Sequence, residues 1–403
     1  MLLQPLILLH LLGILFFALL FYVFIPGIGA FAIRRSWRRF RRSLTESAIY
    51  TPLDYKELRK AEAESCAEER KYRFFGHLQA MQGDNTIWVS DGKVSASADL
   101  ERVFVYILSE ESSWVESGYR EYPVQPPRKV LWEKISSLPE YTQVFLSGEL
   151  EWRDKRGVFK NSAEHPLLVI IYEGEPQDII IRAVWSGRQK NEYWNSLTPG
   201  SLILGSFSLF IYFYILMSFP KLLLPAIIAL SLSLIPVVPL FPPAVLFYYY
   251  YRGLWKRGRV LRAQRDLIRV PLMHFHHQKE SFESNSNLRQ AALLKTGEQY
   301  LMTRFQSLEE MTSQADNRSI HFIKPSLPWK LIGHKYYLFS NEELQRPSDP
   351  MAEMIAVPGS PFQLLAECEK RAVRYELLGL SILAVGIGIT ELLVFVLFSF
   401  LLV

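Results

Sequence analysis

The chain has almost no cysteine and none of the common catalytic motifs. Its two cysteines, Cys66 and Cys368, lie far apart in charged surroundings, which excludes a disulfide framework and a cysteine zinc site. The phosphate-binding patterns GxxxxGK(S/T) and GxGxxG, the GxSxG elbow, the HExxH motif and SxxK with its partner motifs are also missing. These absences make a protein that binds or supports others more expected than an enzyme.

Charge is scarce in four long stretches. Apolar runs occupy residues 2–33, 201–219, 222–251 and 377–403. Because about 20 mainly apolar residues cross a bilayer, each run is long enough for a transmembrane helix. The sequence therefore predicts a membrane protein with four transmembrane α-helices, in which residues 201–251 form a hairpin of helices 2 and 3.

Basic residues are concentrated at one end of these runs. The formal net charge of +5 is modest, so this placement indicates membrane topology rather than nucleic-acid binding. By the positive-inside rule, both soluble regions are expected in the cytoplasm and both termini outside, in a plasma or inner membrane. The flanking residues are Arg34, Arg35, Arg38, Arg39, Arg41 and Arg42, then Arg252, Lys256, Arg257, Arg259 and Arg262, then Lys370, Arg371 and Arg374.

Proline predicts irregular helices in two places. The first run, residues 1–33, lacks a basic n-region and is too long for a signal peptide, so we expect a retained helix that breaks near Pro26, Gly27 and Gly29. The third run is expected to be kinked or broken because each interior proline removes a helical hydrogen bond. Its prolines are Pro225, Pro236, Pro239, Pro242 and Pro243.

The first soluble region reads as a helical segment followed by strands. Residues 34–71 form a basic juxtamembrane segment and a charged helix that starts near Thr51. Residues 72–198 predict a mostly-β domain, a small barrel or sandwich, with strands at 73–81, 86–90, 93–99 and 103–108. Residues 74–78 resemble 145–150, and 103–110 resemble 167–173, which suggests a duplication.

The second soluble region, residues 252–375, has the size and pattern of a small α+β domain. Residues 287–314 read as one or two helices interrupted near Gly297, and residues 319–323, 335–339 and 351–357 read as short strands. Ser360 and Pro361 start a helix that is expected to continue into the fourth apolar run, residues 377–403.

Glu391 and His10 are the intramembrane polar candidates. Glu391 lies inside the fourth run, where an unpaired carboxylate costs on the order of a few kcal/mol. Counted from the outer ends of their runs, His10 and Glu391 lie roughly 12 and 18 Å deep, close enough to pair as a hydrogen bond or a proton-sensitive contact. Gly379, Gly386 and Gly388 predict close packing of the same helix.

Two further groups of residues are candidate sites. Arg34, Arg35, Arg38, Arg39, Arg41 and Arg42 are candidates for anionic lipid headgroups, in addition to their role as topology anchors. His274, His276 and His277 form a cluster that is a weak metal candidate, since zinc sites normally show a fuller ligand set. No catalytic residue and no cofactor is indicated.

Three functions agree with these patterns. The favoured one is a non-enzymatic scaffold or accessory subunit that presents its cytoplasmic domains to a partner protein. Either a protein partner or a homo-oligomer is expected, and a homo-oligomer without a partner favours the alternatives below. The alternative is a small ion-coupled transporter or permease component that uses Glu391 and His10. A membrane-bound metalloenzyme that uses the histidine cluster is the second alternative.

Overall fold

The computed structural model describes residues 3–63, 71–83, 85–108, 127–135, 137–153, 156–162, 165–189, 193–275, 289–315, 320–323 and 335–402. The chain divides into two compact units. The helical unit comprises Met1–Arg38, Asn191–Arg259 and Lys370–Val403, and the sheet unit comprises Arg39–Lys190 and Val260–Glu369.

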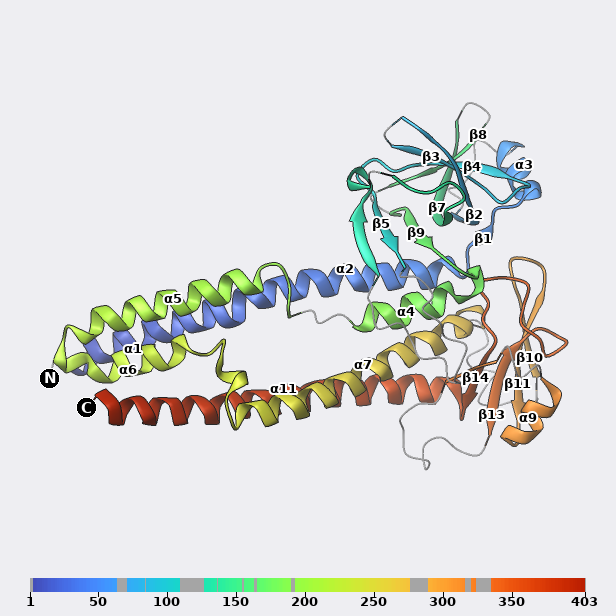
Figure 1. Cartoon of the computed structure of the whole chain (residues 1–403). Helices are drawn as coiled ribbons and strands as arrows, with labels where there is room; N and C mark the ends of the chain where they lie inside the picture. The colour runs from blue at the N-terminus through green and yellow to red at the C-terminus, as the bar shows by residue number, and fades with distance from the viewer. Residues whose placement is uncertain are drawn as a thin grey trace. The chain divides into compact units, whose positions relative to one another are not determined.

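The helical unit is built from long apolar helices. In the described part of the chain, three are long and apolar enough to cross a membrane: Gln4–Ser47, Thr198–Met217 and Pro361–Leu402. Most of their large apolar side chains are exposed, which is compatible with insertion into lipid. Figure 1 labels its helices α1 (Leu3–Leu19), α2 (Ile25–Ser47), α5 (Thr198–Met217), α6 (Leu223–Ser233), α7 (Ala244–His274) and α11 (Pro361–Leu402). Between them lie three short helical turns, the π-helical η1 (Leu20–Phe24), η4 (Pro220–Leu222) and η5 (Val238–Leu240).

The first helix does not break at Pro26, contrary to expectation. Because Pro26 has no backbone N–H, it cannot bond to the carbonyl of Tyr22 four residues earlier. The helix widens into the π turn η1, where the N–H of Ile25 donates to the carbonyl of Leu20. The Tyr193 hydroxyl donates to the Tyr22 carbonyl at 2.8 Å. A distant side chain thus satisfies the carbonyl that the proline leaves free, and the helix continues into α2.

The segment before α5 also contacts the first helix next to Pro26. The Asn195 side-chain amide donates to the Pro26 carbonyl at 3.1 Å. This approach depends on Gly29, because a Cβ at that position would collide with the Asn195 side chain. Further along the helix pair, Gly205 of α5 packs directly on η1. A Cβ added to Gly205 would lie 2.8 Å from the Tyr22 ring. Small residues therefore allow close helix contact, as is usual in membrane helix pairs.

The third apolar run is divided, as its prolines predict. It forms α6, which follows α5 as the second arm of a hairpin through η4, and α7, which begins at Ala244. With 11 residues, α6 is about 16 Å long, whereas the apolar core of a bilayer measures about 30 Å. The Thr390 hydroxyl of α11 accepts the backbone N–H of Ala244 at 3.0 Å and so satisfies one free donor at the start of α7.

Helices α7 and α11 pack through glycines. An added Cβ on Gly386 would collide with Phe247, and one on Gly379 would lie 3.4 Å from the ring of Tyr251. Gly388 has open space around it. The close packing expected of the fourth helix is therefore confirmed at two of the three glycines.

The first sheet of the sheet unit contains a closed barrel. Strands β2, β3, β4, β8 and β7 pair in that order, and β7 pairs back onto β2. Strands β4 and β8 are parallel and the other pairs antiparallel, the connectivity of five-stranded OB-type barrels. The mostly-β, barrel-like region expected from the sequence is confirmed. The strands are β1 (Thr51–Pro52), β2 (Lys71–Gln82), β3 (Thr86–Ser90), β4 (Ser95–Asp99), β5 (Phe104–Ile107), β6 (Arg128–Leu131), β7 (Gln143–Arg153), β8 (Arg156–Lys160) and β9 (Leu168–Tyr172).

The barrel closes because β2 serves two neighbours. Its first half pairs with β7 and its second half with β3. At the crossover lies Gly76, where an added Cβ would be 2.7 Å from the Ser90 carbonyl. Inward side chains such as Phe74, Val89 and Phe159 fill the interior. The segments that look repeated in the sequence pair with each other, β2 with β7 and β5 with β9, and a duplication stays a prediction.

The charged helix starts later than expected. Thr51 and Pro52 form β1, a short strand parallel to β2, and α3 (Tyr55–Ala63) follows. Asp54 is the residue that caps it, since its carboxylate accepts the backbone N–H of Glu57 at 2.7 Å.

The second sheet has the order β10, β11, β13, β14, β12, and Figure 1 shows α9 beside it. The helices expected over residues 287–314 are wrong for most of that range. Gly297 has φ +88° and lies in the turn of a hairpin of β10 and β11, so among residues 289–314, which the structure describes, α9 alone is helical. The short strands expected further on are present. The elements are β10 (Arg289–Leu293), β11 (Gln299–Phe305), α9 (Leu308–Gln314), β12 (His321–Phe322), β13 (Tyr336–Ser340) and β14 (Ile355–Pro358).

A buried ion pair joins the two sheets. The Arg73 guanidinium on β2 pairs with the Asp349 carboxylate before β14, and their side chains are 2% and 1% exposed. Arg73 also donates to the Tyr50 carbonyl at 3.0 Å, and Asp349 accepts the N–H of Met351 at 2.9 Å. A second contact adds to it, since Arg346 pairs with Glu353 and donates to the backbone carbonyl of residue 177, just before α4 (Ile179–Gln189). The two sheets therefore fold as one unit.

We predict that Asp349→Asn destabilises the sheet unit by about 3–5 kcal/mol, because it leaves the buried Arg73 charge uncompensated. Thermal unfolding of the purified protein in detergent measures the effect. Arg269→Met, which removes an exposed charge from α7, is the control and should change the free energy of unfolding by about 0.5 kcal/mol or less. The double variant Arg73→Met/Asp349→Leu should recover much of the loss. If Asp349→Asn unfolds at the same temperature as wild type, the pair does not have this role.

Candidate functional site

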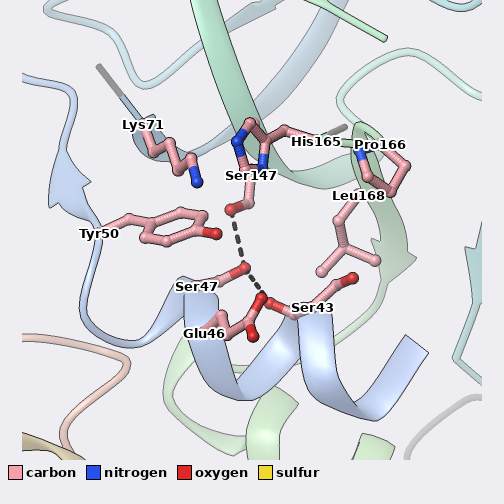
Figure 2. A pocket seen from close by; sticks show the side chains of 10 residues that line it. Ser43, Glu46, Ser47, Tyr50, Lys71, Ser147, His165, Pro166 and Leu168 are labelled. Carbon is pink, nitrogen blue, oxygen red and sulfur yellow. Dashed lines mark hydrogen bonds between the residues drawn. The ribbon is translucent and has the colours of Figure 1, made fainter. Parts of the chain in front are cut away.

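A pocket in the sheet unit lies between the end of α2 and the barrel (Figure 2). Its cavity volume is about 60 Å³, which is far below that of typical small-molecule sites. Its lining comes from four segments far apart in the sequence, and it is mainly polar. The lining residues are Ser43, Glu46, Ser47, Tyr50, Lys71, Ser147, Gly148, His165, Pro166 and Leu168.

Three serines form the floor of the pocket. The Ser47 hydroxyl lies 2.7 Å from both the Ser43 carbonyl and the Ser147 hydroxyl. Since a hydroxyl carries one proton, Ser147 donates to Ser47 when Ser47 donates to the carbonyl. Ser47 and Ser147 are buried, so the bond fixes the end of α2 on β7. The Ser43 hydroxyl makes no hydrogen bond within the described residues.

The charged side chains in and beside the pocket differ in whether an oppositely charged group lies next to them. The Glu46 carboxylate accepts Arg42 Nε at 2.7 Å, and Arg42 is exposed. The Glu149 carboxylate lies beside the pocket, 3.5 Å from His165 Nε2, and its buried Oε1 accepts no hydrogen bond within the described residues. The Lys71 ammonium lies 6.0 Å from the centre of the Tyr50 ring. No carboxylate pairs with Lys71 within the described residues.

Tyr50 supplies a neutral hydroxyl. Burial raises the pKa of its phenol, and the nearby Glu46 and Glu149 carboxylates raise that pKa further against an opposing effect of Arg42. The phenol therefore stays protonated and can donate a hydrogen bond at neutral pH. Figure 2 shows this hydroxyl and the Lys71 ammonium pointing to the same side of the pocket as the Ser147 hydroxyl.

The geometry favours binding over covalent catalysis. Activation of a serine requires a hydrogen bond from its hydroxyl to a base, here His165. The hydrogen bond of the Ser147 hydroxyl within the described residues is made with Ser47 instead. Sequence reasoning missed this pocket, because no local motif connects Ser43, Lys71 and His165. The spacing of Ser43 and Ser47, four residues apart on one helix face, was a weak signal.

The structure does not join His10 to Glu391. The His10 ring is 2.8 Å from the Tyr212 hydroxyl of α5. Both Glu391 carboxylate oxygens are buried without a hydrogen-bond partner among the described residues. The Glu391 carboxylate interacts electrostatically with the Tyr22 side chain. Tyr22 lies 12 residues after His10, about 18 Å along the helix. Depth counted from the ends of the apolar runs therefore misplaced the two residues.

The arginines after the first apolar run divide into paired and exposed groups. Arg41 is buried and lies 3.6 Å from the Asp266 carboxylate of α7, while Arg34 lies 3.9 Å from Glu376 of α11. Arg42 is exposed but pairs with Glu46. The remaining exposed arginines are Arg35, Arg38 and Arg39, and the lipid-headgroup role expected for the cluster stays a prediction.

His274 is the described member of the histidine cluster; His276 and His277 lie outside the described residues. Its ring packs edge-on against Tyr300, 5.5 Å between centres. Burial lowers the pKa of His274 to about 4, assisted by the nearby Arg73 guanidinium and opposed by Asp349. Within the described residues no group of three histidine, cysteine or acidic side chains could hold a metal ion.

We predict that His274 makes the sheet unit less stable in acid. Its pKa is about 4 in the folded chain and about 6.5 when unfolded, so the unfolded chain binds more protons between these values. The free energy of unfolding should therefore be highest above pH 6.5 and fall by on the order of 3 kcal/mol as the pH decreases to 4.

Denaturant unfolding of wild type and His274→Leu across this pH range measures the difference. The variant should lose that part of the pH dependence, while His77→Gln, which changes an exposed histidine, should keep it. Equal slopes for wild type and His274→Leu contradict the prediction.

Comparison of the chain with models of protein families, with curated proteins and with solved structures gave no match.

Proposed function

We propose that the chain is a multi-pass membrane protein that acts as a non-enzymatic scaffold or accessory subunit, presenting its sheet unit to a partner protein. The observation that carries the proposal is the buried Arg73–Asp349 pair. It fastens two sheets, from segments separated by the apolar residues 201–251, into one body with a fixed surface. A rigid composite surface is suited to recognising a protein, because little conformational entropy is lost on binding.

The same pair supports four membrane crossings. Residues 39–190 and 260–369 belong to one compact unit, so both must lie on the same side of a membrane. The chain between them then has to cross the membrane an even number of times. Since α5 is one crossing, α6, the proline-containing residues 234–243 and the start of α7 together supply the return. A broken crossing is tolerated where neighbouring helices satisfy its free backbone groups, as Thr390 does for Ala244.

The basic residues support a cytoplasmic sheet unit with both termini outside, in a plasma or inner membrane. Exposed cations lie on α2, α7 and α11, all next to the apolar segments: Arg35, Arg38, Arg252, Lys256, Arg257, Lys370 and Arg374. Such clusters are typical of the cytoplasmic face. They also suit contact with anionic lipids, worth about 1 kcal/mol for each charge near an acidic leaflet.

The experiment is native mass spectrometry of the protein extracted gently from its own membrane. We expect a partner protein, or a second copy of the chain, in fixed stoichiometry. Asp349→Asn, which separates the two sheets, should lose the partner, whereas Arg269→Met should retain it. A wild-type chain that carries no protein partner contradicts the scaffold proposal.

A second candidate function rests on Glu391. Two buried carboxylate oxygens without a partner are costly in an apolar unit unless they serve a proton or cation. An ion-coupled transporter is the class that uses such a group. It predicts ion or proton flux in proteoliposomes that Glu391→Gln abolishes and His10→Ala leaves intact, because His10 bonds to Tyr212 instead. Flux that is unchanged in Glu391→Gln removes this candidate.

A further inference from the structure

We propose that Glu391 is a proton-binding site in the helical unit, and that the Tyr22 hydroxyl is the group that stabilises its carboxylate when the proton leaves. This site belongs to the transporter candidate and names the proton as its coupled ion, so it rests on that candidate and not on the scaffold function.

Glu391 is isolated from other charges. It is the only aspartate, glutamate, lysine or arginine in residues 3–33, 198–219, 222–251 and 377–402. Both of its carboxylate oxygens are buried, and neither has a hydrogen-bond partner among the described residues. A carboxyl group in such surroundings takes up a proton, because an unpaired buried ion costs much more free energy than the neutral acid. The conformation in the structure therefore corresponds to the protonated site.

A proton suits this site better than a metal cation. Metal cations are held by several oxygen ligands at once. The described residues contain no group of three acidic, histidine or cysteine side chains that could hold a metal ion. The hydroxyl of the neighbouring Thr390 is already used, because it donates to the Gly386 carbonyl and accepts the Ala244 N–H, both at 3.0 Å. A proton needs a single oxygen atom, which Glu391 itself supplies.

Tyr22 is placed to stabilise the ionised form. Its side chain interacts electrostatically with Glu391, and residues 198–211 of α5 and 223–247 of α6 and α7 carry no titratable side chain. The Tyr22 hydroxyl lies 3.2 Å from the Ser206 hydroxyl, beyond the range of about 2.5–3.0 Å for O–H···O bonds. This weak bond lets the hydroxyl turn to a carboxylate, to which a hydrogen bond is stronger.

Two irregular helices flank Glu391. Tyr22 lies in the π turn η1, and π turns occur frequently at functional sites. The run that forms α6 and α7 is interrupted over residues 234–243, and the first N–H of α7 binds Thr390, the neighbour of Glu391 in α11. Figure 1 shows α11 passing the start of α7, in agreement with the contact of Gly386 and Phe247. Discontinuous membrane helices are typical of ion sites in transporters.

The test is infrared difference spectroscopy of the full-length protein in nanodiscs, titrated from acid to alkaline pH. The C=O stretch of a neutral carboxylic acid is separate from the bands of a carboxylate, and subtraction of Glu391→Gln isolates the band of Glu391. We expect that acid band at neutral pH and its loss at alkaline pH. Glu376→Gln, which changes a carboxylate of the same helix that is paired with Arg34, should leave it unchanged.

Further variants keep the test independent of how Glu391→Gln folds. Glu391→Asp retains the carboxyl group and should show an acid band at a shifted frequency. Tyr22→Phe should move the loss of the band to higher pH by about one unit, a tenfold change in proton affinity, because the ionised form loses a charge-assisted hydrogen bond. Tyr212→Phe removes a phenol hydroxyl that contacts His10 instead, and it should titrate like wild type.

The outcomes separate the site from transport. An acid band that titrates supports the proton site with or without proton flux in proteoliposomes, and without flux only the transporter candidate falls. A Glu391 carboxylate that is ionised at neutral pH overturns the site even if flux is found. Loss of the acid band on addition of Na⁺ at constant pH also overturns it, because the site then binds a metal cation. A Tyr22→Phe titration equal to wild type overturns the role given to Tyr22.

Discussion

The buried Arg73–Asp349 pair is the contact on which the rest of this architecture depends. Two charges of 2% and 1% exposure are costly to remove from water, and each is held by further backbone hydrogen bonds. The pair is formed when two sheets made from distant parts of the chain meet. In the proposed membrane topology it therefore requires residues 39–190 and 260–369 on one side of the bilayer, and this requirement restricts how the apolar segments between them can cross.

In the helical unit, too, polar groups that lack a local partner are satisfied by distant residues, and here the groups are neutral. Proline removes backbone hydrogen bonds, and in an apolar helical unit other protein groups have to replace them. The Tyr193 hydroxyl covers the carbonyl left free before Pro26, and Thr390 covers the first free N–H of α7. Glycines at positions 29, 205, 379 and 386 leave the room these contacts need. Glu391 is the exception, because its carboxylate oxygens have no such partner among the described residues.

Much of the architecture was predictable from local pattern. Alternating apolar residues and turn dipeptides placed most barrel strands, and the five prolines predicted the break in the third run. Two errors share one cause. The continuous helix at Pro26 and the His10–Tyr212 bond depend on contacts with distant residues, which local propensity does not report. The pocket was missed for the same reason, since Ser43, Lys71 and His165 meet only in the fold. The hairpin at Gly297 is local, and there the glycine was interpreted as a helix interruption although it forms a turn between adjacent strands.

Hydrogen exchange of the full-length protein in nanodiscs tests the central claim that the two sheets form one body. The opening free energies of amides in β2 and β7 should match those in β11 and β13, and Asp349→Asn should lower both sets together. Loss of protection in the second sheet alone, with an unchanged barrel, would contradict the account. The sheets would then be separate domains, and the partner surface would not be a composite of the two.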